Sequence, residues 1–158
     1  MITSKRMATV DRNAAALGVS PARLMENAGA ALGREAGRGD PDDALVLAGT
    51  GNNGGDALVA ARFLGGAVDV ETVLLGDCSD IRTEEARENW EILRSSEESV
   101  VELDDSASLE GMGFDVDVIV DGMLGVGVSG ALREPVASAV EAVNGSDARV
   151  VSADVPTG

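Results

Sequence analysis

The sequence contains neither histidine nor tyrosine. Without histidine, the chain can form no Ser-His-Asp or Cys-His catalytic site and no histidine-bound zinc site. Without tyrosine, it cannot transfer a hydride with the help of a Tyr-Lys pair. Any general acid or base must therefore be Asp, Glu, Cys78, Lys5, a chain terminus or a bound water molecule.

Basic residues and cysteines are also scarce. The chain has 12 Lys and Arg residues against 28 Asp and Glu residues, which gives a net charge of −16. This charge repels nucleic acids and anionic membranes, and we expect neither as a partner. The plainest interpretation is a solvated acidic surface, but halophiles also use high net charge to stay soluble, so a salt-loving source is a second hypothesis. Cys78 is the single cysteine and cannot form an internal disulfide.

Long apolar runs are absent as well. None approaches the roughly 18–20 residues that span a bilayer, and residues 1–6 do not lead into the apolar core of a signal peptide. We therefore expect a soluble cytoplasmic protein. A chain of 158 residues with 44% apolar and 2% aromatic residues predicts one domain with a core of small aliphatic side chains.

Short apolar runs alternate with helical patterns along the whole chain. Strands are predicted at 44–48, 68–75, 99–103, 116–120 and 149–153, and helices at 4–17, 20–37, 56–64, 83–94, 106–112 and 135–145. This alternation predicts an α/β fold, a Rossmann-like three-layer α/β/α sandwich with a mostly parallel central sheet. The chain stops on the loop after a buried strand, so we expect that the last strands and a helix of the domain lie beyond Gly158.

A glycine-rich segment joins the first predicted strand to the following helix. Gly49, Gly51 and Gly54 match the G-x-G-x-x-G fingerprint of dinucleotide-binding proteins in its required context. Glycine permits positive φ and lets the backbone approach a phosphate, which a helix N-terminus then holds. Asp56 is expected to cap that helix. A tight structural turn without a ligand is the alternative.

Acidic residues follow two of the other predicted strands. Asp121 and Asp154 each close a strand, and the carboxyl ends of parallel strands share the edge where ligands bind. Together with Asn and Thr oxygens they form a donor set that suits an alkali or alkaline-earth cation better than zinc. An NAD site would need an acid at the end of the second strand, and Asp69, Glu71 and Asp77 match that position poorly.

Four motifs in this order resemble one known family, the NAD(P)H-hydrate epimerases (YjeF N-terminal domain). They are Leu24-Met25-Glu26-Asn27-Ala28-Gly29, Ala48-Gly49-Thr50-Gly51-Asn52-Asn53-Gly54-Gly55-Asp56, Asp121-Gly122-Met123-Leu124-Gly125-Val126-Gly127 and Asp154-Val155-Pro156-Thr157-Gly158. The resemblance covers essentially the whole chain, so we treat residues 1–158 as a single domain of this kind.

The resemblance implies an isomerase that epimerises the C6-hydroxyl centre of hydrated NAD(P)H, called NADHX or NADPHX, as a step of nucleotide repair. It implies a homodimer, a bound potassium ion and a fused or separate dehydratase as partner. Asn53, Asp121 and Thr157 would hold the potassium, and Asp121 is the candidate for acid–base catalysis. Asn52, Asn53, Gly54, Gly55, Asp56, Gly125, Val126, Gly127, Val128, Ser129, Gly130, Ala131 and Asp154 would line the substrate.

Three positions depart from the family pattern. Ala57 stands where glycine is common, Phe63 where histidine is frequent, and Thr157 where serine is usual, although Thr157 keeps the hydroxyl. Two alternative functions remain open. One is a non-catalytic nucleotide-binding or interaction module of the same fold, and the other is an NAD(P)-dependent dehydrogenase, which would have to work without His or Tyr.

Overall fold

A computed structural model describes residues 4–96, 98–109, 111–125, 130–154 and 157. Its strands are β1 (Asp43–Ala48), β2 (Asp69–Leu75), β3 (Ser99–Leu103), β4 (Val118–Gly122) and β5 (Arg149–Ser152). Its α-helices are α1 (Ser4–Ala16), α2 (Pro21–Ala36), α3 (Asn52–Leu64), α4 (Glu84–Arg94) and α5 (Val136–Gly145). Two short 3₁₀ turns, η1 (Cys78–Asp80) and η2 (Ser106–Leu109), complete the described elements. None of the described helices is long and apolar enough to cross a membrane.

The described strands form one sheet. They lie in the order β3-β2-β1-β4-β5, and each neighbouring pair is parallel. Consecutive strands of this kind need crossover connections, which the helices between them supply. The predicted α/β class with a mostly parallel sheet is confirmed.

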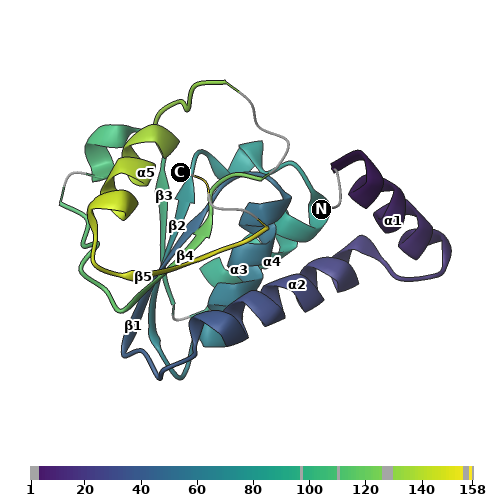
Figure 1. The fold of residues 1–158 in the computed structure, drawn as a ribbon, viewed down its shortest axis with the longest axis horizontal. Coiled ribbons are helices and arrows are strands. Elements are labelled where there is room, and N and C mark those ends of the chain that lie inside the picture. Colours follow the sequence, from purple (N-terminus) through teal and green to yellow (C-terminus); the bar gives the residue numbers. More distant parts are fainter. Residues whose placement is uncertain (1–3, 97, 110, 126–129, 155–156, 158) are drawn as a thin grey trace.

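Helices cover both faces of the sheet. Figure 1 shows α2, α3 and α4 on one side and α5 on the other. Along β1, Val46 and Ala48 pack with the helices of the first side, whereas Leu45 and Leu47 pack with α5 and its surroundings. Both sets of side chains are buried, and this explains why the strand is a continuous apolar run. The three-layer prediction is therefore confirmed.

The small residues of α2 pack against a helix and not against the sheet. A Cβ atom on Gly29 would lie 2.4 Å from Cβ of Val59, and one on Gly33 would lie 3.1 Å from the carbonyl oxygen of Ala60. Both contacts are on α3. α2 starts where the sequence predicts a helix. Ser20 Oγ accepts a hydrogen bond from the Arg23 amide, and Pro21 occupies the first turn of α2.

Two predicted helices differ from the structure. The helix expected from residue 56 begins at Asn52, with Gly51 as its N-cap residue. Tertiary packing outweighs the low helix propensity of glycine here, because Gly55 lies against the side chain of Met25, where a Cβ would come within 2.5 Å of Cε. The helix expected near residues 106–112 is only the 3₁₀ turn η2.

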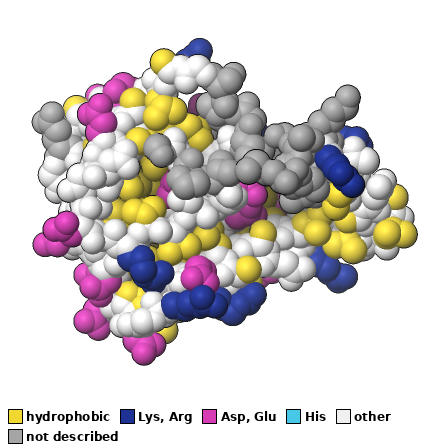
Figure 2. All heavy atoms as spheres, in the orientation of Figure 1, with side chains coloured by type: hydrophobic (Ala, Val, Ile, Leu, Met, Phe, Trp, Pro, Cys, Tyr) yellow, Lys and Arg dark blue, Asp and Glu magenta, His cyan; other side chains and the backbone are white. Residues whose placement is uncertain are grey.

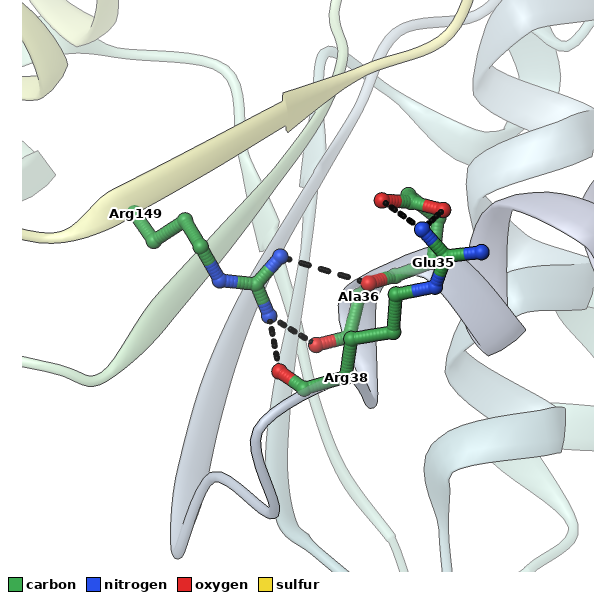
Figure 3. A network of polar contacts seen from close by, with 4 residues as sticks. All are labelled: Glu35, Ala36, Arg38 and Arg149. Carbon is green, nitrogen blue, oxygen red and sulfur yellow. Dashed lines mark hydrogen bonds and ion pairs between the residues drawn. The ribbon is translucent and has the colours of Figure 1, made fainter.

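Arg149, the first residue of β5, joins this edge strand to the end of α2. Its guanidinium donates hydrogen bonds to the carbonyl oxygens of Glu35 (3.2 Å), Ala36 and Arg38 (2.9 Å), as Figure 3 shows. The last carbonyls of an α-helix have no partner within the helix. The planar fork of Arg149 therefore both caps α2 and fixes the position of the β5 edge.

We predict that Arg149→Ala destabilises the protein by about 1–3 kcal/mol, because it leaves helix-end carbonyls without a donor. Arg149→Lys should recover only part of this stability, since an ammonium cannot reproduce the fork. Urea unfolding measures the free energies, with Arg133→Ala, at an exposed position outside any helix or strand, as the matched control. An Arg149→Ala variant as stable as this control would contradict the assignment.

Candidate functional site

The sheet has its switch point between β1 and β4. These strands are neighbours, yet the helix after β1 packs on one face and the helix after β4 packs on the other. In open α/β sheets, ligands bind in the crevice that such a reversal creates at the carboxyl ends of the strands. The glycine-rich segment after β1 and Asp121 near the end of β4 both lie at this edge, as the sequence predicts.

Glycine at this edge permits backbone contact. A Cβ on Gly49 would lie 2.0 Å from the carbonyl oxygen of Met123, and one on Gly54 would lie 1.7 Å from that of Gly49. Gly49, Gly51 and Gly54 do not use the positive φ that glycine permits, so the close backbone approach is what requires glycine at Gly49 and Gly54. Gly130, in the second glycine-rich loop, does have a φ of 97°.

Asn53 joins three segments at this edge. Its side-chain Nδ2 donates hydrogen bonds to the carbonyl oxygens of Leu124 (3.0 Å) and Ala153 (3.0 Å). Asn53 lies in the first turn of α3, while its two partners follow β4 and β5. Gly125 lies against the same side chain, where a Cβ would come within 3.2 Å of it. The amide therefore bridges the glycine-rich segment to the two loops that carry Asp121 and Asp154.

Asp121 makes the second bridge. The residue is 3% exposed, and its Oδ1 accepts hydrogen bonds from the Thr157 hydroxyl (2.7 Å) and the Met123 amide (3.2 Å). Its Oδ2 accepts one from the Thr157 amide (2.9 Å). The Thr157 hydroxyl accepts a further hydrogen bond from the Leu124 amide (3.3 Å). The hydroxyl that Thr157 shares with the usual serine is thus used, and the departure from the family pattern preserves the contact.

Asp56 does not cap α3, so this prediction is wrong. The helix begins four residues earlier, and no side chain caps it. Asp56 lies one turn inside the helix, half-buried, and shares a pocket of about 290 Å³ with Asp154. Leu32 and Glu35 of α2 and Ser152 of β5 line the same pocket.

Two effects raise the pKa of Asp56 from 3.8 to about 7. The larger is burial, which disfavours the charged carboxylate, and the second is the negative charge of Asp154. Glu35 adds a further carboxyl to the walls of the pocket. Arg62, on the same helix as Asp56, forms an ion pair with Glu26 (3.0 Å).

The remaining predicted residues do not all lie together. Asn52, Gly54, Gly55 and Gly125 lie at the edge described above, and Gly130 and Ala131 lie in the exposed loop after β4. Val126, Gly127, Val128 and Ser129 lie outside the described residues. Asp77 belongs to a separate group beyond β2, where its Oδ1 accepts a hydrogen bond from the Ser79 amide (2.7 Å).

Sequence reasoning did not find the backbone groups of the site. The carbonyl oxygens of Leu124 and Ala153 and the amide of Met123 fix the two bridging side chains. Every residue carries these groups, so no residue type signals them. Only their position could have indicated these backbone groups, because they lie within two residues of the end of β4 or β5.

We predict a pH-dependent effect of Asp56→Asn on stability. Between pH 3.8 and about 7 the folded chain keeps a proton on Asp56 that the unfolded chain loses. The free energy of unfolding therefore falls as the pH rises through this window. The variant lacks this titration, so its stability relative to wild type should be greater at pH 8 than at pH 4.

Thermal unfolding at both pH values checks this expectation. Glu141→Gln, which removes an exposed carboxyl on α5, is the matched control and should show a smaller pH effect. An equal stability difference between Asp56→Asn and wild type at pH 4 and pH 8 would count against the raised pKa.

Comparisons with known proteins identify the family of this chain. The family described as YjeF-related protein N-terminus matches residues 21–158. The chain is 45% identical over 162 residues to the bifunctional NAD(P)H-hydrate repair enzyme Nnr of Methanopyrus kandleri, covering 99% of this chain and 32% of that protein. It is 44% identical over 165 residues to the NAD(P)H-hydrate epimerase of Cenarchaeum symbiosum, covering 99% of this chain and 74% of that protein.

A solved structure gives the same result for the fold. The crystal structure of the yeast protein YNL200c superimposes with a TM-score of 0.78 at 28% sequence identity. The match covers 100% of this chain and 71% of the yeast chain. The chain thus spans about a third of the Methanopyrus protein and about three quarters of the Cenarchaeum protein. By sequence and by fold, it belongs to the family of YjeF-related N-terminal domains.

Proposed function

We propose that the protein epimerises the C6-hydroxyl centre of hydrated NAD(P)H, either NADHX or NADPHX. The observation that carries this proposal is the convergence of three sequence motifs on one edge of the sheet. Asn53 from the motif after β1 contacts the loops after β4 and β5, and Asp121 from the motif at the end of β4 holds Thr157 from the motif after β5. The relatives from Methanopyrus and Cenarchaeum are named for NAD(P)H-hydrate repair and epimerisation, which supports the proposal.

The reaction needs only acid–base chemistry. The substrate hydroxyl is on the carbon next to the ring nitrogen, so protonating it lets the nitrogen lone pair expel water. The resulting iminium carbon is planar, and water that adds to its opposite face inverts the centre. A carboxyl group can supply and accept the protons. The absence of His and Tyr is therefore no obstacle.

Asp121 is the carboxyl that the sequence assigns to catalysis. We propose that the site depends on it, either directly as the acid–base group or indirectly because it holds Thr157 in place. Its side chain also lines a pocket of about 230 Å³ between β4, β5 and α5, together with Met123 and Ser152. Asp121 thus lies between the second glycine-rich loop and the end of β5.

The donor set at this edge fits a potassium ion. The Asn53 side chain, the Asp121 carboxylate and the Thr157 hydroxyl offer hard oxygen atoms, and these suit alkali and alkaline-earth cations. Nδ2 of Asn53 faces two carbonyl oxygens, which leaves its Oδ1 available as a ligand. We propose that these three residues hold potassium, which would supply a positive charge beside the anionic nucleotide.

The proposal also covers the oligomeric state, the cellular location and the partner enzyme. We propose a cytoplasmic homodimer that acts with a dehydratase, fused or separate, because the Methanopyrus relative is named as bifunctional. A non-catalytic binding module of the same fold remains the second candidate. An NAD(P)-dependent dehydrogenase is the third, and it has the least support because Asp77 lies in a separate exposed turn.

We predict that the protein interconverts the epimers when it is incubated with a single epimer of NADHX, and that Asp121→Asn abolishes this activity. Asp121 accepts hydrogen bonds that an amide nitrogen cannot accept, so the variant should also lose part of the contact that holds Thr157. Chiral chromatography of the products measures the rate, and circular dichroism checks the fold. Glu141→Gln is again the matched control.

Three outcomes of this assay separate the candidate functions. Interconversion of the epimers supports the epimerase. Tight binding without a reaction supports a binding module, and oxidation of a substrate with reduction of NAD supports a dehydrogenase. A folded Asp121→Asn protein that works at the wild-type rate would refute the role given to Asp121.

We also propose that the protein works at high salt. Acidic residues outnumber basic ones by 28 to 12, so the basic side chains cannot neutralise the acidic ones. On the face drawn in Figure 2 the acidic side chains stand in several separate groups, where dissolved cations would screen their repulsion.

This proposal predicts that the unfolding temperature rises from low-salt buffer to molar KCl, because screening weakens the repulsion. The same measurement in NaCl separates screening from binding, since screening is alike for the two salts. A rise specific to KCl at low concentration would report the cation site. An unfolding temperature unaffected by either salt would refute adaptation to salt.

A further inference from the structure

The pocket between α2, α3 and the end of β5 contains a pair of carboxyl groups to which no proton transfer has been assigned. Asp56 comes from α3, and Asp154 follows β5. The volume of about 290 Å³ is close to that of small ligand pockets. Ala28 and Leu32 provide an apolar wall. A flat, partly apolar ring can therefore meet two carboxyls from different elements here.

Buried Asp121 and half-buried Asp56 differ in how many hydrogen bonds their carboxylate oxygens accept. Asp121 accepts three hydrogen bonds, from the Met123 amide and from the amide and hydroxyl of Thr157. Among the described residues, none donates a hydrogen bond or forms an ion pair with the Asp56 carboxyl. A group that passes protons to a substrate needs an oxygen that the protein does not already occupy. Asp56 meets this requirement better than Asp121.

Asp154 is held in an unusual backbone conformation. Its φ is 64°, in the left-handed region that residues other than glycine rarely adopt. The preceding residue is fixed on both sides, because the Ala153 amide donates to the Asp121 carbonyl oxygen (2.8 Å) and its carbonyl oxygen accepts from Asn53 (3.0 Å). Strained residues of this kind occur at ligand sites, where the surrounding contacts impose the geometry.

We propose that Asp56 and Asp154 are the acid–base pair of the epimerisation, one carboxyl serving each face of the substrate ring. This inference rests on the proposed function and assigns its proton transfers to two residues. The raised pKa of Asp56, about 7, supports it, because a substantial share of Asp56 then carries a proton near neutral pH. A carboxyl with such a pKa is suited to act as a general acid at that pH.

The steps balance without an oxidant or a reductant. Asp56 gives its proton to the C6 hydroxyl, the C–O bond breaks, and water leaves as the ring nitrogen lone pair forms the C=N bond. A water molecule then adds to C6 from the other face, its proton passes to the Asp154 carboxylate, and the C=N electrons return to nitrogen. The pair ends with its proton on Asp154. This is the state from which the opposite epimer reacts.

The assignment gives Asp121 a positioning role. Asp121 holds Thr157 and the Met123 amide, and its main-chain carbonyl oxygen holds Ala153, the residue before Asp154. Loss of its carboxylate would then stop the reaction by displacing the groups around the pocket. Asp56 and Asp154 would be the groups that touch the reacting oxygen atoms.

Oxygen exchange tests this division of roles. Each purified NADHX epimer is incubated in ¹⁸O-labelled water, and mass spectrometry follows label in the C6 hydroxyl while chiral chromatography follows epimerisation. In Asp154→Asn, the epimer whose hydroxyl faces Asp56 should still lose and regain water on that face. Label exchange should therefore continue while epimerisation falls by about 100-fold or more. Asp56→Asn should show the same behaviour for the opposite epimer only.

The controls separate this inference from the proposed function. Glu141→Gln removes an exposed carboxyl on α5, which does not line this pocket, and should leave both rates unchanged. Asp56→Glu keeps a carboxyl and should retain measurable epimerisation, which guards against a folding defect. Epimerisation at the wild-type rate in either Asn variant, or an equal loss of exchange and epimerisation for both epimers, overturns the pair. A wild-type protein inactive towards both NADHX and NADPHX overturns the proposed function itself.

Discussion

Backbone contact between the carboxyl ends of β1 and β4 is the constraint on which the site depends. The Gly49 amide donates a hydrogen bond to the Gly122 carbonyl oxygen (3.1 Å), and a side chain on Gly54 would overlap the backbone of Gly49. Because the segments touch directly, Asn53 reaches the loops after β4 and β5. A methyl group at any of these glycines would force the backbone apart and separate the residues that make up the site.

The fold and the location of the site were predictable from the sequence. Parallel strands buried on both faces give apolar runs such as residues 44–48, and their alternation with helices leaves few possible topologies. The carboxyl ends of these strands must lie at one edge. Asp121 and Thr157, 36 residues apart, are therefore brought together by topology alone, and the structure shows their hydrogen bonds.

The details that were not predictable depend on contacts between distant segments. The start of α3 at Asn52 follows from packing of Gly55 against Met25, which local helix propensity cannot indicate. Because α3 begins at Asn52, Asp56 lies inside the helix and lines a pocket instead of capping the helix. Its raised pKa then depends on burial and on Asp154, which lies 98 positions away in the chain. The same aspartate is a helix cap in the local pattern and a pocket residue in the fold because the helix begins one turn earlier.

The hydrogen bonds of Arg149 hold the amino end of β5 against the end of α2. The amino end is anchored to a helix terminus, whereas the carboxyl end leads into Asp154. β5 pairs with β4 on one side, and no other described strand lies on its outer side. Glu35, whose carbonyl oxygen accepts a hydrogen bond from Arg149, also lines the pocket that contains Asp154. One guanidinium therefore ties together the two elements, α2 and β5, that form opposite walls of that pocket.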